Sequence, residues 1–567
     1  MADDPVRPWW PVAVVGGLAC VLLVVLVVKV LRWDWWAVGD FGTLRLRTLD
    51  VGTSETPLVG IYSRWGWNHP GPMLFYALAG PLRLTGGDAH GLLLGALLLN
   101  AAALAAAAWV AARAGRAALA ATGLVAALLV VGLDPGELLD PWNPFVLILP
   151  LFAASVAAWR CALGDRVAAL VLVVAGSFAV QAHVGVTVVV ATLFLVGAAG
   201  LVVRAVRGGS PEVRAHARVT LAVAVGVGLL CWLAPIVQQL TGSPGNLGEL
   251  LDFALHSDEP VNGWADGARH VGQALSLPPL WVTGDIGTAS DSHPVPWGVL
   301  LLVAAGAWAW RRRWTSELVL CGTALVLVAA SLVAASRVSG IAFPYLFRWL
   351  WAVGAFVWLA VLIVVLAELR RHAWDRIAES VLGGVTGLVL VALLIGGPDT
   401  TALESSDRSL RTFEQLIEPT VEVLRTAPGP TLITVADYGV DGSFGLELLA
   451  RADDEDLDIR YPTSVAYVLG GSRTIEPAEA RSELVLASNP ESQARLAADP
   501  RFRLVAEYDP LSPEERAEYQ RLAAIDWDSR PDGPSDPGPE YRRFRELSEY
   551  FESLAVFYAE GPPPTGG

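Results

Sequence analysis

The sequence has little charge and almost no lysine. Charged residues make up 17% of the 567 residues and hydrophobic residues 54%, whereas soluble domains carry roughly 25% charged residues. Lys29 is the single lysine, so the positive charge comes almost entirely from arginine. With a mean hydropathy of +0.48, this composition excludes an ordinary soluble protein and indicates a polytopic membrane protein.

Cysteines are also few, and several common site motifs are missing. The four cysteines lie in or at the ends of apolar runs, and none forms a CxxC pair. This pattern excludes a disulfide framework and a cysteine-based metal signature. The polar tail contains no glycine-rich phosphate loop, no catalytic triad and no metal-ligand cluster.

The net charge of −16 is unevenly distributed. Residues 398–567 contain 33 acidic and 16 basic side chains, so the rest of the chain is nearly balanced. The tail is therefore expected to be a soluble acidic domain, and its charge argues against nucleic acid as a partner.

Long apolar runs predict about eleven membrane-spanning helices, since about 20 apolar residues cross a bilayer. The expected spans are 11–31, 88–112, 117–133, 143–159, 167–183, 185–203, 219–238, 296–310, 316–335, 346–368 and 377–396. The run 71–84 is too short to cross and is expected to be an interfacial or re-entrant helix.

The orientation follows from arginine-rich loops, which all fall on one side in this helix count. Because positive loops mark the cytoplasmic side, the N-terminus is expected on the cytoplasmic side of the cytoplasmic membrane. The first loop (32–87) and the acidic tail are then outside. The expected domains are 1–397 in the membrane, 398–528 as a small extracytoplasmic α/β domain, and 529–567 as a Pro/Gly-rich linker, short helix and disordered end.

The polar first loop is the main candidate for chemistry. Asp40 follows the first helix closely, where a partly desolvated carboxylate is able to act as a general base. The structural alternative is a helix cap or a solvated acid, and the same alternative holds for Asp34 and Asp50.

The cations of this loop suggest an anion site. Arg45, Arg47 and Arg64 carry forked donors that suit a phosphate, and His69 is a candidate donor or acid/base. Attraction to anionic lipid headgroups explains the arginines equally well, and a lone histidine before a proline is often a turn residue.

Polar side chains in the other outer loops provide additional candidates. Asp140 is a candidate second carboxylate or metal ligand, with a helix cap as its structural alternative. The further candidates are Asn143, Gln181, His183, Arg337, Tyr345 and Arg348.

The order of these features resembles the GT-C superfamily of membrane glycosyltransferases, of actinobacterial type. That superfamily includes protein O-mannosyltransferases, aminoarabinose transferases of lipid A and arabinofuranosyltransferases. Asp40 stands at the acidic position after the first helix, His69-Pro70-Gly71-Pro72 leads the non-spanning helix, and Asp140-Pro141-Trp142-Asn143-Pro144 stands at a second acidic motif. The usual Asp-Glu pair is Asp40-Phe41 here, and the usual lysine is His69.

The resemblance implies an enzyme that uses a polyprenyl-phosphate sugar donor and an acceptor of the cell envelope. Asp40 would deprotonate the acceptor hydroxyl, which attacks the anomeric carbon with inversion. Arg45, Arg47, Arg64 or His69 would stabilise the departing phosphate. Such enzymes differ in their need for a divalent cation, so the resemblance leaves a metal open. The sugar and the acceptor stay open too.

Other functions compete with a transferase. A polytopic transporter or a flippase of envelope lipid precursors would carry charged residues deep within several helices, but the expected spans are almost purely apolar. A non-enzymatic envelope scaffold, with the acidic tail recruiting a partner, would not depend on Asp40.

Overall fold

The chain folds into two compact units, and the second is built from two separate stretches of sequence. The first comprises Met1–Trp33 and Pro57–Thr400, and the second Asp34–Thr56 and Thr401–Gly567. The computed structural model describes residues 10–33, 35–37, 39–284, 295–372, 374–397, 407–436, 441–455, 457–525, 538–548 and 553–563. Each unit is described below by itself.

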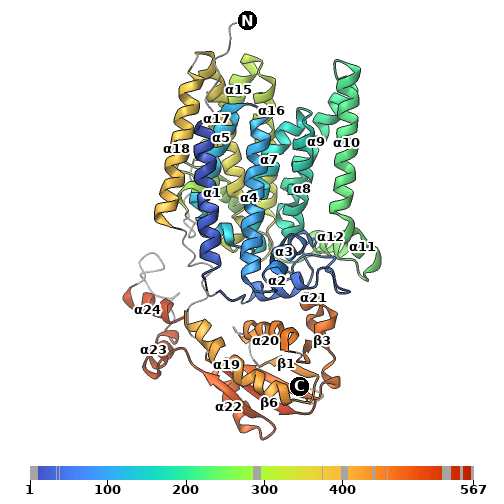
Figure 1. The fold of residues 1–567 in the computed structure, drawn as a ribbon, viewed down its shortest axis with the longest axis vertical. Coiled ribbons are helices and arrows are strands. Elements are labelled where there is room, and N and C mark those ends of the chain that lie inside the picture. Colours follow the sequence, from blue (N-terminus) through green and yellow to red (C-terminus); the bar gives the residue numbers. More distant parts are fainter. Residues whose placement is uncertain are drawn as a thin grey trace. The chain divides into compact units, whose positions relative to one another are not determined.

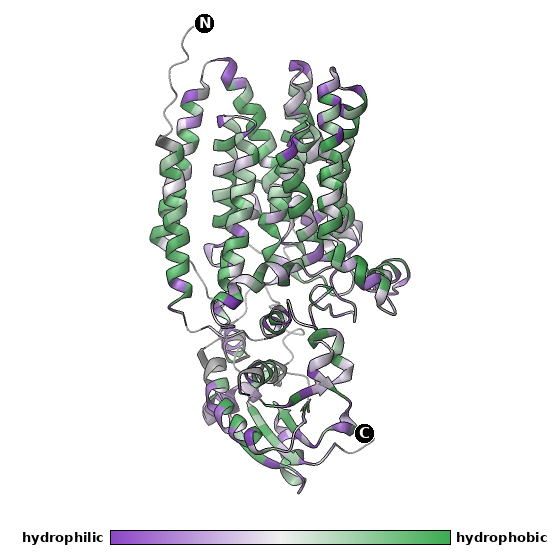
Figure 2. Cartoon of the chain, turned by 45° about the vertical axis from the view of Figure 1, so that its right-hand side comes forward, coloured by the Kyte–Doolittle hydropathy of each residue, from purple (hydrophilic) through white to green (hydrophobic). Residues whose placement is uncertain are grey.

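The first unit is a bundle of apolar helices that run side by side (Figure 1). Its long helices are α1 (Trp10–Val30), α4 (His90–Ala112), α5 (Arg116–Leu133), α7 (Ile148–Ala162), α8 (Arg166–Ala182), α9 (Thr187–Arg207), α10 (Pro211–Cys231), α15 (Trp297–Arg312), α16 (Thr315–Ser336), α17 (Leu350–Arg371) and α18 (Asp375–Gly396). Hydrophobic residues cover most of their length and polar residues gather at their ends (Figure 2).

These helices confirm the predicted multi-pass membrane fold. Within the described residues, nine helices are long and apolar enough to cross a membrane. Two further helices of the bundle, α8 and α15, are shorter, with 17 and 16 residues. The predicted span 219–238 has the wrong bounds. Ser210 caps α10 and Pro211 starts it, so this span begins earlier, at Pro211, and ends at Cys231.

Short elements collect at one end of the first unit. They are α3 (Met73–Leu84), η1 (Pro135–Leu139), α6 (Asn143–Val146), η2 (Val184–Val186), α11 (Leu233–Thr241), α12 (Asn246–His256), α13 (Gly263–Ala274), α14 (Leu280–Thr283) and η3 (Pro344–Phe347). Arginines mark the opposite helix ends, where Arg113 pairs with Asp165 at 2.6 Å and Arg312 with Glu368 at 2.9 Å. The two ends of the bundle therefore differ: one carries the arginine-rich loops, and the other carries the short elements that form the site described below.

The second unit is a six-stranded mixed sheet with helices. The strand order is β3-β2-β1-β4-β6-β5. The neighbouring strands β3, β2, β1 and β4 are parallel to one another, and β6 is antiparallel to both β4 and β5. The strands are β1 (Thr431–Val435), β2 (Ile459–Pro462), β3 (Thr474–Ile475), β4 (Ser482–Ala487), β5 (Arg503–Tyr508) and β6 (Leu554–Glu560). The helices are α19 (Asp407–Thr426), α20 (Asp441–Glu455), α21 (Ala466–Leu469), α22 (Pro490–Ala498), α23 (Pro513–Ala523) and α24 (Pro539–Ser548), with short η4 (Thr463–Val465), η5 (Gly471–Arg473) and η6 (Pro477–Glu479). The predicted C-terminal α/β domain is thus confirmed in its fold class.

The core of this unit follows the alternation of side chains along its strands. In β4, Leu484 and Leu486 belong to the larger core cluster with α19 and α20, whereas Val485 and Ala487 belong to a smaller cluster that includes Leu496 of α22. Both faces of β4 are therefore covered, and every residue of the strand is buried.

Two parts of the second unit depart from the sequence-based picture. Helix α2 (Asp40–Leu49) lies in the first loop, but Leu46 is fully buried in the larger core cluster of the second unit. A Cβ on Gly42 would lie 3.2 Å from Leu446 of α20, so the two helices pack closely. Strand β6 lies in the segment expected to hold only a linker, a short helix and a disordered end. Residues 526–537, which include most of the expected linker, fall outside the described residues.

Candidate functional site

A hairpin between α2 and α3 positions the first polar side chain of the site. Gly60 donates to the carbonyl of His69 at 2.8 Å, and His69 donates to the carbonyl of Ile61 at 2.9 Å. The turn passes through Gly66, whose φ of 84° lies in the left-handed region that favours glycine. The hairpin thereby places His69 directly before the proline that leads into α3.

His69 and His183 form a ring pair within the first unit. Their centroids lie 4.7 Å apart, and each Nδ1 accepts from a backbone amide, of Val184 at 3.2 Å and Gly185 at 3.1 Å. Burial lowers the pKa of His69 well below its usual value, and the proximity of His183 adds to this; burial also lowers the pKa of His183 to about 4. Both rings are therefore neutral near pH 7, with the proton on Nε2.

Gln181 connects this pair to neighbouring helices. It is fully buried, and its Nε2 donates to the carbonyl of Cys231 at 2.8 Å, while its Oε1 has no partner among the described residues. A Cβ on Gly71 would lie 2.2 Å from that Oε1, so the chain needs a glycine there. Asn143 donates to the carbonyl of Ala182 at 3.0 Å and brings the second acidic motif alongside.

Asp140 of the second acidic motif and Glu137 just before it place two carboxyl groups beside an arginine, and Asp140 is buried while Glu137 is partly buried. Glu137 of η1 contacts a guanidinium nitrogen of Arg348. Burial raises the pKa of Glu137 to about 8, although Arg348 acts in the opposite direction, and burial raises the pKa of Asp140 to about 7. Asp140 also accepts from the backbone amide of Trp142 at 2.7 Å, as expected of a turn residue.

Arg348 is held between aromatic rings in the turn between η3 and α17. Its side chain is 4% exposed, and its Cζ lies 3.9 Å from the ring centroid of Trp351 and 5.5 Å from that of Phe145. Its Nε and Nη1 have no hydrogen-bond partner within the described part of the chain. Tyr345 packs on Trp142 at 4.8 Å. A buried arginine with two unused donors is suited to an anionic group.

Apart from Arg64, the other first-loop candidates that the structure describes lie in the second unit, where Arg45, Arg47 and Asp50 form ion pairs. Asp40 is the first residue of α2, a position at which the helix dipole favours a carboxylate. Asp50 is buried between Arg47, at 2.5 Å, and Arg473, at 2.8 Å. Arg45 lies 3.8 Å from Glu447.

The structure therefore divides the predicted residues into two groups. His69, Asp140, Asn143, Gln181, His183, Tyr345 and Arg348 belong to the polar end of the first unit, and Asp40, Arg45, Arg47 and Asp50 belong to the second unit. Arg64, also in the first unit, donates to the carbonyls of Ser339 and Ile341 at 2.9 and 3.0 Å. Arg337 is exposed at the end of α16, and Asp34 lies outside the described residues.

Sequence reasoning undervalued two residues of the first unit. Glu137 was one of several acids in its loop, and only its pairing with Arg348, 211 residues away, distinguishes it. Asn246 fixes the hairpin, since it accepts from the amide of Asn68 and donates to its carbonyl, each at 2.9 Å. Nothing in the local sequence of Asn246 signals that role. Among the residues that the structure describes, no three His, Cys, Asp or Glu side chains are grouped to hold a metal ion.

Comparison with solved structures supports the fold. No family model and no curated protein matches the sequence. The fold is similar to that of ArnT from Cupriavidus metallidurans in the apo state, with a TM-score of 0.50 and 13% identity over 88% of this chain and 96% of that chain. ArnT from the same organism bound to undecaprenyl phosphate gives a TM-score of 0.47 and 14% identity over the same shares. The chain thus has a fold similar to that of ArnT.

Proposed function

We propose that this protein is a membrane glycosyltransferase that transfers a sugar from a polyprenyl-phosphate donor to an acceptor of the cell envelope. The observation that carries the proposal is the similarity in fold to ArnT, which extends over 88% of the chain. The polar cluster at one end of the apolar helices, formed by His69, Glu137, Asp140, Gln181, His183 and Arg348, adds to it. Ionisable groups with strongly shifted pKa values, such as Glu137 and Asp140, often mark functional sites.

The reaction is proposed at the outer face of the cytoplasmic membrane. The arginine-rich loops lie at the end of the first unit opposite the His69 and Arg348 clusters, and positively charged loops favour the cytoplasmic side. On this orientation, the polar cluster faces the outside, where a lipid-linked sugar meets a water-borne acceptor.

Asp40 is the proposed general base. It removes the proton from the acceptor hydroxyl while the hydroxyl oxygen attacks the anomeric carbon. The bond from that carbon to the phosphate oxygen breaks, polyprenyl phosphate leaves, and the configuration inverts. The support is the position of Asp40 shortly after the first span, in the motif order described for the sequence.

His69 and Arg64 are the stronger proposed ligands of the donor phosphate. The neutral His69 offers an Nε2–H donor, and Arg64 carries donors beyond those used on two carbonyls. Arg45 and Arg47 were also predicted to bind phosphate, but their ion pairs with Glu447 and Asp50 give them a structural role in the second unit.

The test is a transfer assay with the full chain in nanodiscs and a panel of radiolabelled polyprenyl-phosphate sugars. Asp40→Asn is expected to lower kcat by about 10²–10⁴-fold, the usual contribution of a general base. Glu55→Gln, which removes another acid of the same loop, is the control and should keep wild-type turnover. Wild-type kcat in Asp40→Asn would exclude the base, and lipid transport without transfer would favour a flippase.

A further inference from the structure

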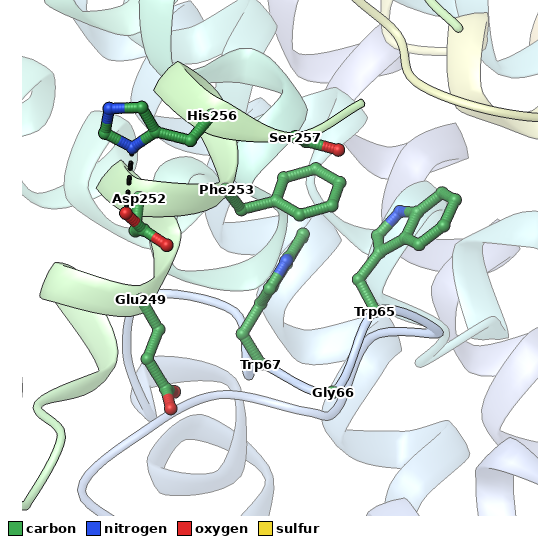
Figure 3. A pocket seen from close by; sticks show the side chains of 8 residues that line it. All are labelled: Trp65, Gly66, Trp67, Glu249, Asp252, Phe253, His256 and Ser257. Carbon is green, nitrogen blue, oxygen red and sulfur yellow. Dashed lines mark hydrogen bonds and ion pairs between the residues drawn. The ribbon is translucent and has the colours of Figure 1, made fainter. Parts of the chain in front are cut away.

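An open pocket of about 340 Å³ lies beside the polar cluster of the first unit. Its lining includes Trp65, Trp67, Glu249, Asp252, Phe253 and His256. In Figure 3, Trp67 and Trp65 both lie beside Phe253, and the carboxylates of Glu249 and Asp252 project from α12. Its volume falls at the lower end of the roughly 300–1,000 Å³ pockets that hold small ligands.

The spacing along α12 explains why its polar side chains share this pocket. Glu249, Asp252, Phe253 and His256 recur at three- and four-residue intervals, which places them on one helix face. Asp252 and His256 are hydrogen-bonded to each other at 2.8 Å. One wall of the pocket therefore presents hydrogen-bonding groups around a phenyl ring.

The opposite wall is the hairpin that carries His69, and it is held rigidly. The two hydrogen bonds between Asn68 and Asn246 join the hairpin to the start of α12. Trp65 is fixed by Phe253 at 5.3 Å and by the Arg64 guanidinium at 4.8 Å. These contacts set the positions of the aromatic rings along this wall.

This combination of groups suits a neutral sugar ring. A pyranose or furanose presents C–H groups, which pack on aromatic rings, and hydroxyl groups, which donate to acceptor-only carboxylates. A cationic ligand suits the pocket less well. The Arg64 guanidinium already lies over the ring of Trp65 and would repel a cationic ligand. Trp67 and Phe253 pack edge-to-face at 5.5 Å and leave no room for a cation between their rings.

We infer that this pocket binds a sugar residue and serves as the subsite for a glycan acceptor. The acceptor role rests on the proposed transferase function, whereas sugar binding itself does not. The aromatic contacts continue from Trp67 to His69 at 5.8 Å and from there to His183. A sugar in the pocket would thus lie next to the polar cluster.

The binding experiment uses saturation-transfer NMR with the full chain in nanodiscs. The probes are mannotriose, arabinotriose and chitotriose, with choline as the cationic probe. Glu249→Gln and Asp252→Asn remove the proposed acceptors without altering side-chain size, and Phe253→Leu removes the ring. Asp258→Asn, an exposed acid just beyond the pocket, is the matched control.

At least one oligosaccharide is expected to bind the wild type and the control, and to bind each acceptor variant roughly tenfold or more weakly, as the loss of a charge-assisted hydrogen bond predicts. Absence of oligosaccharide binding, equal binding by the pocket variants, or binding of choline in place of sugars would overturn the inference.

A transfer assay separates this inference from the proposed function. If the wild type transfers sugar, the pocket variants should raise the KM for a glycan acceptor and leave the KM for the donor unchanged. Sugar binding that depends on Glu249 and Asp252, without transfer from any polyprenyl-phosphate sugar, would support the pocket and refute the transferase. Transfer with an unchanged acceptor KM would refute the acceptor role of the pocket.

Discussion

The ion-paired Asp50 offers a direct test of whether a predicted site residue is structural. Its side chain is 5% exposed and lies between the guanidinium groups of Arg47 and Arg473. Asp50→Asn removes the negative charge and leaves two cations facing each other. Removing one partner of a buried ion pair costs about 3–5 kcal/mol. We expect the lower end, about 3 kcal/mol, because asparagine keeps one oxygen acceptor.

That loss corresponds to roughly 100-fold in the equilibrium for opening the second unit. Hydrogen exchange of the full chain in nanodiscs should report it as a similar fall in amide protection along β1 and β4. Adding Arg473→Gln to Asp50→Asn should recover part of the loss, since one unpaired cation is removed. Glu418→Gln is the control, because its pair with Arg425 is exposed and surface changes usually stay within about 0.5 kcal/mol.

A change in protection of less than about threefold in Asp50→Asn would contradict this reasoning. If sugar transfer were lost while protection stayed the same, Asp50 would belong to the reaction site and not to the packing of α2.

Two further predictions concern the first unit. The folded-state pKa of Glu137, about 8, lies above the ordinary value of 4.5, so its stabilisation is complete below pH 4.5 and is lost as the pH rises through 8. Glu137→Gln should flatten the fall in thermal stability over this range, and an unchanged pH profile would contradict a protonated Glu137 carboxyl. Gly71→Ala should lower the stability by about 1–3 kcal/mol through overpacking against Gln181, as measured by thermal unfolding. Gly80→Ala, with nothing within 4 Å of its added Cβ, is the control and should not lower it.

The membrane helices could be predicted well because their signal is local. Each span is a continuous apolar run whose length alone indicates a crossing, so the predicted runs correspond to α1, α4, α5 and the later long helices. The start of α10 was placed too late. The charged first turns after Pro211 lowered the hydropathy of a segment that Ser210 nevertheless caps as helix.

The partners of the first loop could not be predicted, because they lie far away in the sequence. Arg47 and Asp50 look like candidate site residues until Arg473, 423 residues after Asp50, completes their ion pair. The packing partners of Leu46 are also distant in the sequence, since the core cluster that it joins is formed largely by residues of α19 and α20. By contrast, His69 and His183 were both named as candidates, although nothing in the sequence showed that their rings would be paired.

The discontinuous second unit has a consequence for the order of events during synthesis. Helix α2 emerges early, but Thr56 is separated from Thr401 by about 340 residues, which take roughly 20–70 s to translate at 5–20 residues per second. Strand β6, which lies between β4 and β5, is made last of all the strands. Helix α2 must therefore wait, with Leu46 uncovered, until every membrane span has been made. A protein shortened at its C-terminus would leave α2 without its core and would affect the first loop as well as the tail.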